Sequence, residues 1–259
     1  MRVSLYATLF VWAGNTIVAA HAQSSLGIDT LRVGADPDFR PISFSDSSGT
    51  LTGFDADFAA GLAKHLNIPL QYQGVAWDGI VPALTGSKID AITTMVITDK
   101  RKEVVAFSDP VMRQDVTEVV RADRTQNPSL EDLKTLKVGA QINTSAQTAA
   151  TKIPGVNATI YNTVADEYND LMLGRIDVVL IEDVNAYYSV KQAYEGKLRV
   201  TGVPLSSEPA YAGVALRKSD TALLTAVNAA IKAMRADGSL AAVAKKWFGD
   251  AGILAPAAQ

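Results

Sequence analysis

Short apolar runs alternate with one-sided apolar segments along the first half of the chain. Leu31 to Ala35 and Ile89 to Val96 are apolar runs bounded by polar residues, which is typical of buried strands, and Leu70 to Gln73 is expected to form a short strand between them. Residues 53–66 repeat apolar side chains at spacings of three and four, so they predict an amphipathic helix. With a second helix over residues 78–86, the alternation predicts an α/β fold whose parallel sheet is covered on both faces.

Capping residues mark several of the expected helix ends. Asp78 is the expected N-cap of the second helix, and Thr163 with Asp166 predicts the start of a helix in the second half. Residues 178–181 form an apolar run that stops at Glu182, which predicts another buried strand. Toward the C-terminus, a strand over 211–216 is followed by two helices.

Two pairs of similar segments suggest that the chain is built from related halves. Thr30 to Asp36 (Thr-Leu-Arg-Val-Gly-Ala-Asp) is similar in sequence to Thr135 to Gln141 (Thr-Leu-Lys-Val-Gly-Ala-Gln). Gly86 to Ile92 is answered by Gly174 to Val179, each entering a strand through Ile-Asp. Such repetition predicts two similar α/β lobes.

The N-terminus has the pattern of a secretory signal. Arg2 precedes a mostly apolar run from Leu5 to Ala20, and Ala20-His21-Ala22 has the small-x-small form of a cleavage site. We therefore expect a signal peptide over residues 1–22 and a periplasmic mature protein. With 48% apolar and 20% charged residues in 259, the chain is globular and long enough for a sizeable core.

Charge and composition exclude several classes of function. Losing Arg2 with the signal changes the formal charge from −3 to −4 (−3 − 1), which argues against a nucleic-acid partner. There are no cysteines, so disulfides, thiolate metal sites and catalytic cysteines are ruled out. His65 is the one histidine left after cleavage, and we interpret it as structural or surface-exposed. No metal and no cofactor is expected.

An arginine stands where a strand gives way to a helix start. Residues 90–110 run as a strand, break at Thr98-Asp99, make one helical turn that carries Arg101, and return to an extended segment. A guanidinium at such a strand end is a good receptor for a carboxylate, because its planar fork donates two parallel hydrogen bonds. The alternative is a solvated arginine beside Lys100 and Lys102.

The carboxyl ends of the predicted strands carry groups that suit a zwitterion. Ligands of open parallel sheets bind at these ends, where the sequence supplies a cation, acids and aromatic walls. A ligand carboxylate would pair with Arg101, and its ammonium would need Glu182 or Asp183. The candidates are Asp36, Phe39, Trp77, Thr93, Thr94 and Arg101 from the first half and Gln141, Ser145, Glu182 and Asp183 from the second.

Each candidate has an ordinary structural alternative. Phe39 and Trp77 could be core residues. Glu182 with Asp183 could be an N-cap pair favoured by the helix dipole. Gln141 and Ser145 could simply be polar residues that follow strands.

Six motifs in chain order resemble the polar-amino-acid-binding proteins of bacterial ABC importers, solute-binding family 3. They are Gly-Ala-Asp-Pro-Asp-Phe-Arg-Pro (34–41), Gly-Phe-Asp-Ala-Asp (53–57), Trp-Asp-Gly-Ile-Val-Pro-Ala-Leu (77–84), Ile-Thr-Asp-Lys-Arg (97–101), Phe-Ser-Asp-Pro (107–110) and Lys-Lys-Trp-Phe-Gly (245–249). The resemblance implies the two-lobed periplasmic binding protein fold of type II, each lobe a mostly parallel sheet flanked by helices. Lobe 1 would comprise residues 23–112 and 209–259, and lobe 2 residues 113–208.

The resemblance also implies roles for individual residues. Arg101 matches the arginine that binds the ligand α-carboxylate, with Thr94, Val96 and Ser145 around that carboxylate. Glu182 matches the acid that takes the α-ammonium.

The same resemblance suggests what surrounds the ligand side chain, and three departures from the pattern. Phe39 and Trp77 match its aromatic walls, and Asp36 a residue that reaches its tip. Val96 replaces a usual Ser or Thr, Asn143 a usual Gly, and Glu182 a usual Asp.

We therefore expect a monomeric periplasmic binding protein that closes on an amino acid or related amino-carboxylate and presents it to a membrane permease. It is not expected to be an enzyme. Two alternatives stay open: an enzyme on the same fold, similar to cyclohexadienyl dehydratase, with a cleft acid such as Glu182 as general acid, and a ligand sensor.

Overall fold

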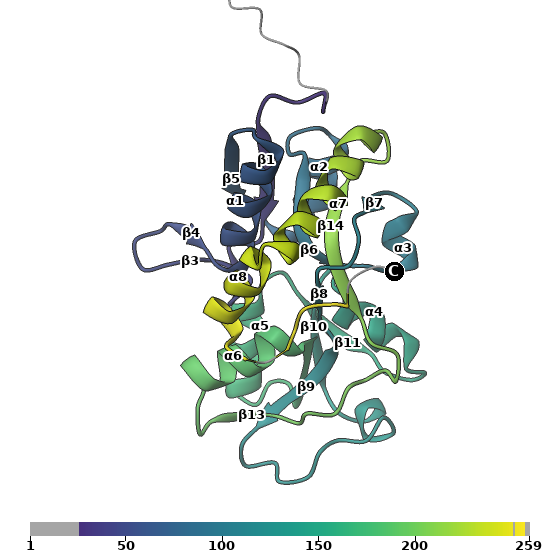
Figure 1. The fold of residues 1–259 in the computed structure, drawn as a ribbon. Coiled ribbons are helices and arrows are strands. Elements are labelled where there is room, and N and C mark those ends of the chain that lie inside the picture. Colours follow the sequence, from purple (N-terminus) through teal and green to yellow (C-terminus); the bar gives the residue numbers. More distant parts are fainter. Residues whose placement is uncertain (1–25, 251, 257–259) are drawn as a thin grey trace, which may run out of the picture.

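The computed structural model describes residues 26–250 and 252–256. The predicted signal peptide, residues 1–22, lies outside these described residues. Two sheets flanked by helices dominate the fold, one in the upper and one in the lower half of Figure 1. We call the part built on the first sheet lobe 1 and the part built on the second sheet lobe 2.

The first sheet has the strand order β5-β1-β6-β14-β7, with β8 paired to β14. Its strands are β1 (Leu31–Ala35), β5 (Leu70–Gly74), β6 (Ala91–Val96), β7 (Ala106–Phe107), β8 (Met112–Arg113) and β14 (Tyr211–Leu216). β1 is parallel to β5 and β6, whereas β14 is antiparallel to β6, β7 and β8. The sheet is therefore mixed, with its antiparallel part made by the chain that returns from lobe 2.

The second sheet repeats this plan in the order β11-β10-β12-β9-β13. Its strands are β9 (Val116–Arg121), β10 (Val138–Gln141), β11 (Ala158–Tyr161), β12 (Val178–Glu182) and β13 (Leu198–Val200). β10 is parallel to β11 and β12, as β1 is to β5 and β6, so the repeated segments occupy equivalent central strands. β9 is antiparallel to β12 and β13. The α/β fold class is confirmed, with two mixed sheets.

Helices cover both faces of each sheet. In lobe 1 these are α1 (Phe54–Leu66), α2 (Trp77–Thr85), the single turn α3 (Asp99–Lys102), α7 (Thr221–Ala236) and α8 (Ser239–Phe248). Lobe 2 has α4 (Ser145–Lys152), α5 (Val164–Met172), α6 (Asp183–Ala193) and the short 3₁₀ helix η1 (Asp132–Lys134). Each sheet consequently has one apolar cluster on either face. Among the described helices, none is long and apolar enough to cross a membrane.

Some local expectations are confirmed and others need correction. Phe58 and Leu62 are buried on the predicted face of α1, and Thr163 caps α5 through the amide of Asp166. Asp78 is not an N-cap: α2 begins one residue earlier, with Ala76 in that position, and Asp78 lies in the first turn. The segment after β1, for which the sequence pattern indicated no strand, forms a small antiparallel sheet of β2 (Asp38–Phe39), β3 (Ser43–Ser45) and β4 (Leu51–Thr52).

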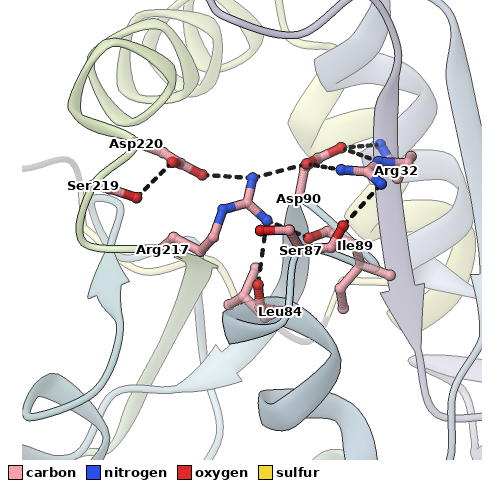
Figure 2. Close-up of polar contacts among 8 residues, drawn as sticks. All are labelled: Arg32, Leu84, Ser87, Ile89, Asp90, Arg217, Ser219 and Asp220. Carbon is pink, nitrogen blue, oxygen red and sulfur yellow. Dashed lines mark hydrogen bonds and ion pairs between the residues drawn. The ribbon is translucent and has the colours of Figure 1, made fainter.

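A buried carboxylate joins three strands at the end of the first sheet away from α3 (Figure 2). Asp90, just before β6, is fully buried and accepts hydrogen bonds from Arg32 Nε at 2.7 Å and Nη2 at 2.6 Å. Arg217, just after β14, donates to the same carboxylate at 2.8 Å. Burial alone would raise the pKa of Asp90, but the two guanidinium groups lower it below its usual value. The pairing fixes β1, β6 and β14 together.

Candidate functional site

One cavity between the two lobes is lined by nine of the eleven candidate residues. It lies where β1 and β6 of lobe 1 face β10 and β12 of lobe 2. The nine are Asp36, Phe39, Trp77, Thr93, Thr94, Val96, Arg101, Gln141 and Glu182. Ser145 is not among the lining residues; it faces a neighbouring groove, and the residue before it, Thr144, lines the cavity instead.

Arg101 bridges the two lobes with its guanidinium group. The turn that carries it starts at Thr98, whose hydroxyl accepts the Arg101 amide at 3.2 Å. Nη1 donates to the carbonyl of Val96 in lobe 1, and Nη2 to the carbonyl of Asn143 in lobe 2, both at 2.7 Å. The group lies 5.3 Å from the ring centre of Trp77. This is not a solvated surface arginine.

The Arg101 guanidinium has no carboxylate partner within 4.0 Å among the described residues. Burial lowers its pKa to about 10, and the negative charge of Glu182 partly opposes that change. A desolvated cation that is hydrogen-bonded only to neutral carbonyl oxygens has no negative charge to balance it. Its chemistry therefore suits it to receive a carboxylate.

Glu182 points into the cavity from the end of β12. Its side chain is buried and accepts a short hydrogen bond from the hydroxyl of Ser145, the first residue of α4. The neighbouring Asp183 turns back to its own helix, where its carboxylate accepts the amide of Val184 at 2.8 Å. Of the suspected N-cap pair, only Asp183 therefore serves the helix start, and Glu182 is left to face the cavity.

Asp36 and Gln141 meet across the cavity. Gln141 Nε2 lies 3.4 Å from Asp36 Oδ2 and 3.1 Å from the carbonyl of Asn162. Asp36 Oδ1 also accepts the amide of Asp38 at 3.0 Å. Burial raises the pKa of Asp36 to about 6, although these hydrogen bonds partly offset the effect. This carboxyl group has no cationic partner in the described chain.

Asp55 lines the cavity as well and was not among the predicted residues. It is buried in the first turn of α1 and accepts the hydroxyl of Thr94 at 2.7 Å. Burial raises the pKa of Asp55 to about 7. The signal for it lay within the Gly-Phe-Asp motif: a helix that starts beneath a strand end turns its first acid toward that end.

Thr94 has a strained backbone next to this acid. Its φ is +27°, a region that β-branched residues rarely enter. Opposite it, the pairing of β6 with β14 is irregular between Gly213 and Ala215. Because its hydroxyl is committed to Asp55, Thr94 is not a free donor for a ligand in this arrangement.

A buried polar group at the cavity, the indole N–H of Trp77, lacks a partner among the described residues. The hydroxyl of Thr93 makes no hydrogen bond of ordinary geometry there either, although it lies close enough to Asp55 to lower the pKa of that carboxyl. An unpartnered buried donor costs free energy, so a bound molecule that accepts a hydrogen bond from the indole N–H would gain from it. Gln114, from the segment that connects β8 with β9, also lines the cavity, and nothing in the sequence pattern indicated it.

The side chains present limit the chemistry of the site. Three carboxyl groups (Asp36, Asp55 and Glu182) face one guanidinium, a set suited to a zwitterion. No group of three metal-ligating side chains occurs among residues 26–250 and 252–256. His65 lies away from the cavity, where its ring nitrogens bond the carbonyl of Gly61 at 2.8 Å and Asp237 at 2.9 Å. Its structural interpretation is confirmed.

Comparison with known proteins gives a family match over nearly all of the described chain. Residues 31–250 match the bacterial extracellular solute-binding proteins, family 3. The L-cystine-binding protein TcyJ of Escherichia coli (strain K12) is 37% identical over 223 residues, covering 85% of this chain and 83% of that protein. The histidine-binding periplasmic protein of the same strain is 33% identical over 226 residues, covering 84% and 87%.

Solved structures agree with these matches. An ancestral arginine-binding protein bound to glutamine superposes with a TM-score of 0.80 at 36% identity, covering 86% of this chain and 99% of that one. The ancestral amino-acid-binding protein AncCDT-1, a precursor of cyclohexadienyl dehydratase, gives a TM-score of 0.77 at 36% identity, covering 85% and 96%.

Proposed function

The chain belongs to the bacterial extracellular solute-binding proteins of family 3, and on that premise we propose that it captures an amino acid or related amino-carboxylate between its lobes for delivery to an ABC importer. The observation that carries the proposal is the pair of opposite charges in one cavity, Arg101 from lobe 1 and Glu182 from lobe 2. The names of the relatives, which bind cystine and histidine, support an amino-acid ligand.

The charges suggest how the ligand would lie. Its α-carboxylate would accept hydrogen bonds from the guanidinium of Arg101 and would replace the carbonyl of Asn143 there. It would then lie near the free backbone amides at the start of α4. Its α-ammonium would bind Glu182, whose hydroxyl partner Ser145 orients the carboxylate. Each buried charge would then have a partner, which avoids a desolvation cost of several kcal/mol.

The rest of the cavity would receive the ligand side chain. Phe39 and Trp77 supply apolar walls, while Asp36 and Asp55 add carboxyl groups that no cation of the described chain neutralises. After Arg101 and Glu182 have paired with the ligand backbone, these two acids favour a polar or cationic side chain.

Hinge closure would complete the site, because lining residues come from both lobes. The chain passes from the first sheet to the second between β8 and β9 and returns between β13 and β14. On this basis we propose that the first segment of lobe 1 ends with β8, so that the first boundary lies after Arg113 instead of at 112/113, and that the second boundary lies at 208/209. With the signal over residues 1–22 and relatives that are named periplasmic, we propose the periplasm as the site of action.

A thermal-shift screen of the mature protein tests the proposal. The compounds would be L-cystine, L-histidine, L-arginine, L-glutamine, opines and small dicarboxylates. A ligand at 100 times its Kd adds about 2.7 kcal/mol of stability, or about 5–10 °C in Tm for a chain of this size. Arg101→Ala should abolish the shift, and Arg175→Ala, an exposed arginine paired only with Asp170, should not. If no carboxylate compound shifts the wild type, the proposal fails.

An enzyme on this fold is the second candidate, favoured by the likeness to a precursor of cyclohexadienyl dehydratase. Glu182 would then act as general acid. The discriminating experiment is incubation of the protein with prephenate and arogenate. Turnover that is lost in Glu182→Gln would support the enzyme, whereas the binding proposal expects none.

A further inference from the structure

A short segment of lobe 1, residues 38–40, contacts lobe 2 outside the cavity. Asp38 Oδ2 accepts the backbone amide of Ala165 at 3.2 Å, and the carbonyl of Arg40 accepts Asn185 Nδ2 at 2.8 Å. None of these four residues lines the cavity. Between them, Phe39 packs against the apolar clusters of both lobes.

Hydrogen bonds within lobe 2 orient the side chain of Asn185 for this contact. The residue is 1% exposed, and its Oδ1 accepts two hydroxyl groups of lobe 2, Tyr168 at 3.0 Å and Ser189 at 3.2 Å. Both donors bind the oxygen, so the amide group cannot flip and Nδ2 faces lobe 1. Next to it, Val184 packs into the apolar cluster of lobe 1.

Asp38 meets a helix start that has a free donor. Thr163 caps α5 through the amide of Asp166, which leaves the amide of Ala165 for another acceptor. A carboxylate at this position also interacts favourably with the helix dipole. Lobe 1 thus supplies a second cap to a helix of lobe 2, and only when the lobes are together.

These contacts share backbone with the cavity. Asn185 lies in the first turn of α6, which begins directly after Glu182. Arg40 lies four residues after Asp36 in one connected segment. Lobe closure around a ligand therefore brings both sets of contacts together.

We propose that Asp38, Arg40, Ala165 and Asn185 form a closure latch, which stabilises the closed arrangement whether or not a ligand is bound and so prolongs ligand residence. The effect on residence rests on the proposed function, but the latch itself does not. Its residues are positioning residues that act on the equilibrium between open and closed lobes.

A distance measurement without ligand tests the latch. Because the chain has no cysteines, Lys64→Cys on α1 and Lys191→Cys on α6, both exposed, allow a spin label on each lobe. Double electron–electron resonance then gives the ratio of closed to open molecules. We expect a substantial closed population in the otherwise wild-type protein.

Asn185→Asp is the sharpest variant, because it keeps the acceptor for Tyr168 and Ser189 but replaces the donor toward Arg40 by an oxygen. The closed-to-open ratio should fall at least about tenfold, and about threefold in Asp38→Ala. Asn169→Ala, an exposed asparagine of α5, is the control and should match the wild type.

Three outcomes would overturn the latch: a wild type that is entirely open, an unchanged ratio in a folded Asn185→Asp protein, or an unchanged ratio in Asp38→Ala. If Asn185→Asp fails to fold by circular dichroism, the surface variant Asp38→Ala decides alone. Since no ligand is present, failure of the amino-acid proposal leaves this result unaffected.

Discussion

Gln141 donates to Asp36 across the cavity, with 3.4 Å between Nε2 and Oδ2, and the two residues occupy equivalent positions in the two halves of the chain. Gln141 ends β10, and Asp36 directly follows β1. The ends of two repeated strands thus meet face to face. The environment of Asp36, and with it the raised pKa, depends on closure of the lobes.

This relationship predicts a pH-dependent preference for basic ligands. Because burial raises the pKa of Asp36 to about 6, its carboxylate forms as the pH rises through that value. Affinity for L-arginine should increase about tenfold between pH 5 and 7.5, whereas affinity for L-glutamine should not. Isothermal titration calorimetry measures both. In Asp36→Asn the part of the dependence near pH 6 should disappear and only a part near pH 7, from Asp55, should remain; an unchanged pH profile would contradict the role of Asp36.

Arg101→Lys should weaken binding nearly as much as truncation. Lysine keeps the charge but cannot reach the carbonyl oxygens of Val96 and Asn143 with one planar group. We expect at least about 100-fold loss of affinity for whichever amino acid binds the wild type, with an unchanged circular dichroism spectrum. Arg175→Lys is the matched control, and equal affinities in Arg101→Lys and wild type would remove Arg101 from the carboxylate site.

Asp55 should make the folded protein less stable as the pH rises. Its pKa of about 7 in the fold exceeds the ordinary value of 3.8, so the folded chain retains a proton that the unfolded chain has released. The resulting stability is complete below about pH 4 and is lost toward pH 7, by up to about 1.4 kcal/mol per pH unit. Urea unfolding of Asp55→Asn should lack this slope. Parallel profiles for the two proteins would contradict the assignment.

Asp90→Asn should destabilise lobe 1 strongly. The substitution leaves Arg32 and Arg217 without their shared charge, and losing one member of a buried ion pair costs about 3–5 kcal/mol. Because the pKa of Asp90 is lowered, this stability exists above about pH 4 and is lost as the pH falls through the folded pKa. Urea unfolding at pH 7 checks the first claim. Asp99→Asn, whose side chain is 99% exposed, should stay within about 0.5 kcal/mol of wild type.

Central strands and their following helices were predictable because burial on both faces imposes long apolar runs. β14 follows the predicted bounds, and β12 differs from them by one residue. The peripheral strands β11 and β13 have only four and three residues, which is too short for periodicity to give a signal. The hairpin of β2 and β3 escaped notice for the same reason, although it contains the contacts of Asp38.

The site was predictable in its composition but not in its internal pairing. Residues at strand ends, together with the family resemblance, identified nine cavity residues without any coordinates. Which of them bond each other depends on how the strands and helices pack within each lobe. Ser145 donates a hydrogen bond to Glu182, and Thr94 donates one to Asp55. Neither pairing could be predicted from the spacing of these residues in the sequence.

Arg217 reaches Asp90 from 127 positions further along the chain, and β14 completes the first sheet only from there. Every strand of lobe 2 is therefore synthesised before β14, the strand that completes the sheet of lobe 1. Before Arg217 is synthesised, Arg32 is the only one of these two arginines that can pair with the carboxylate of Asp90. Lobe 1 therefore cannot complete its sheet, or its half of the cavity, before the segment that follows lobe 2 is in place.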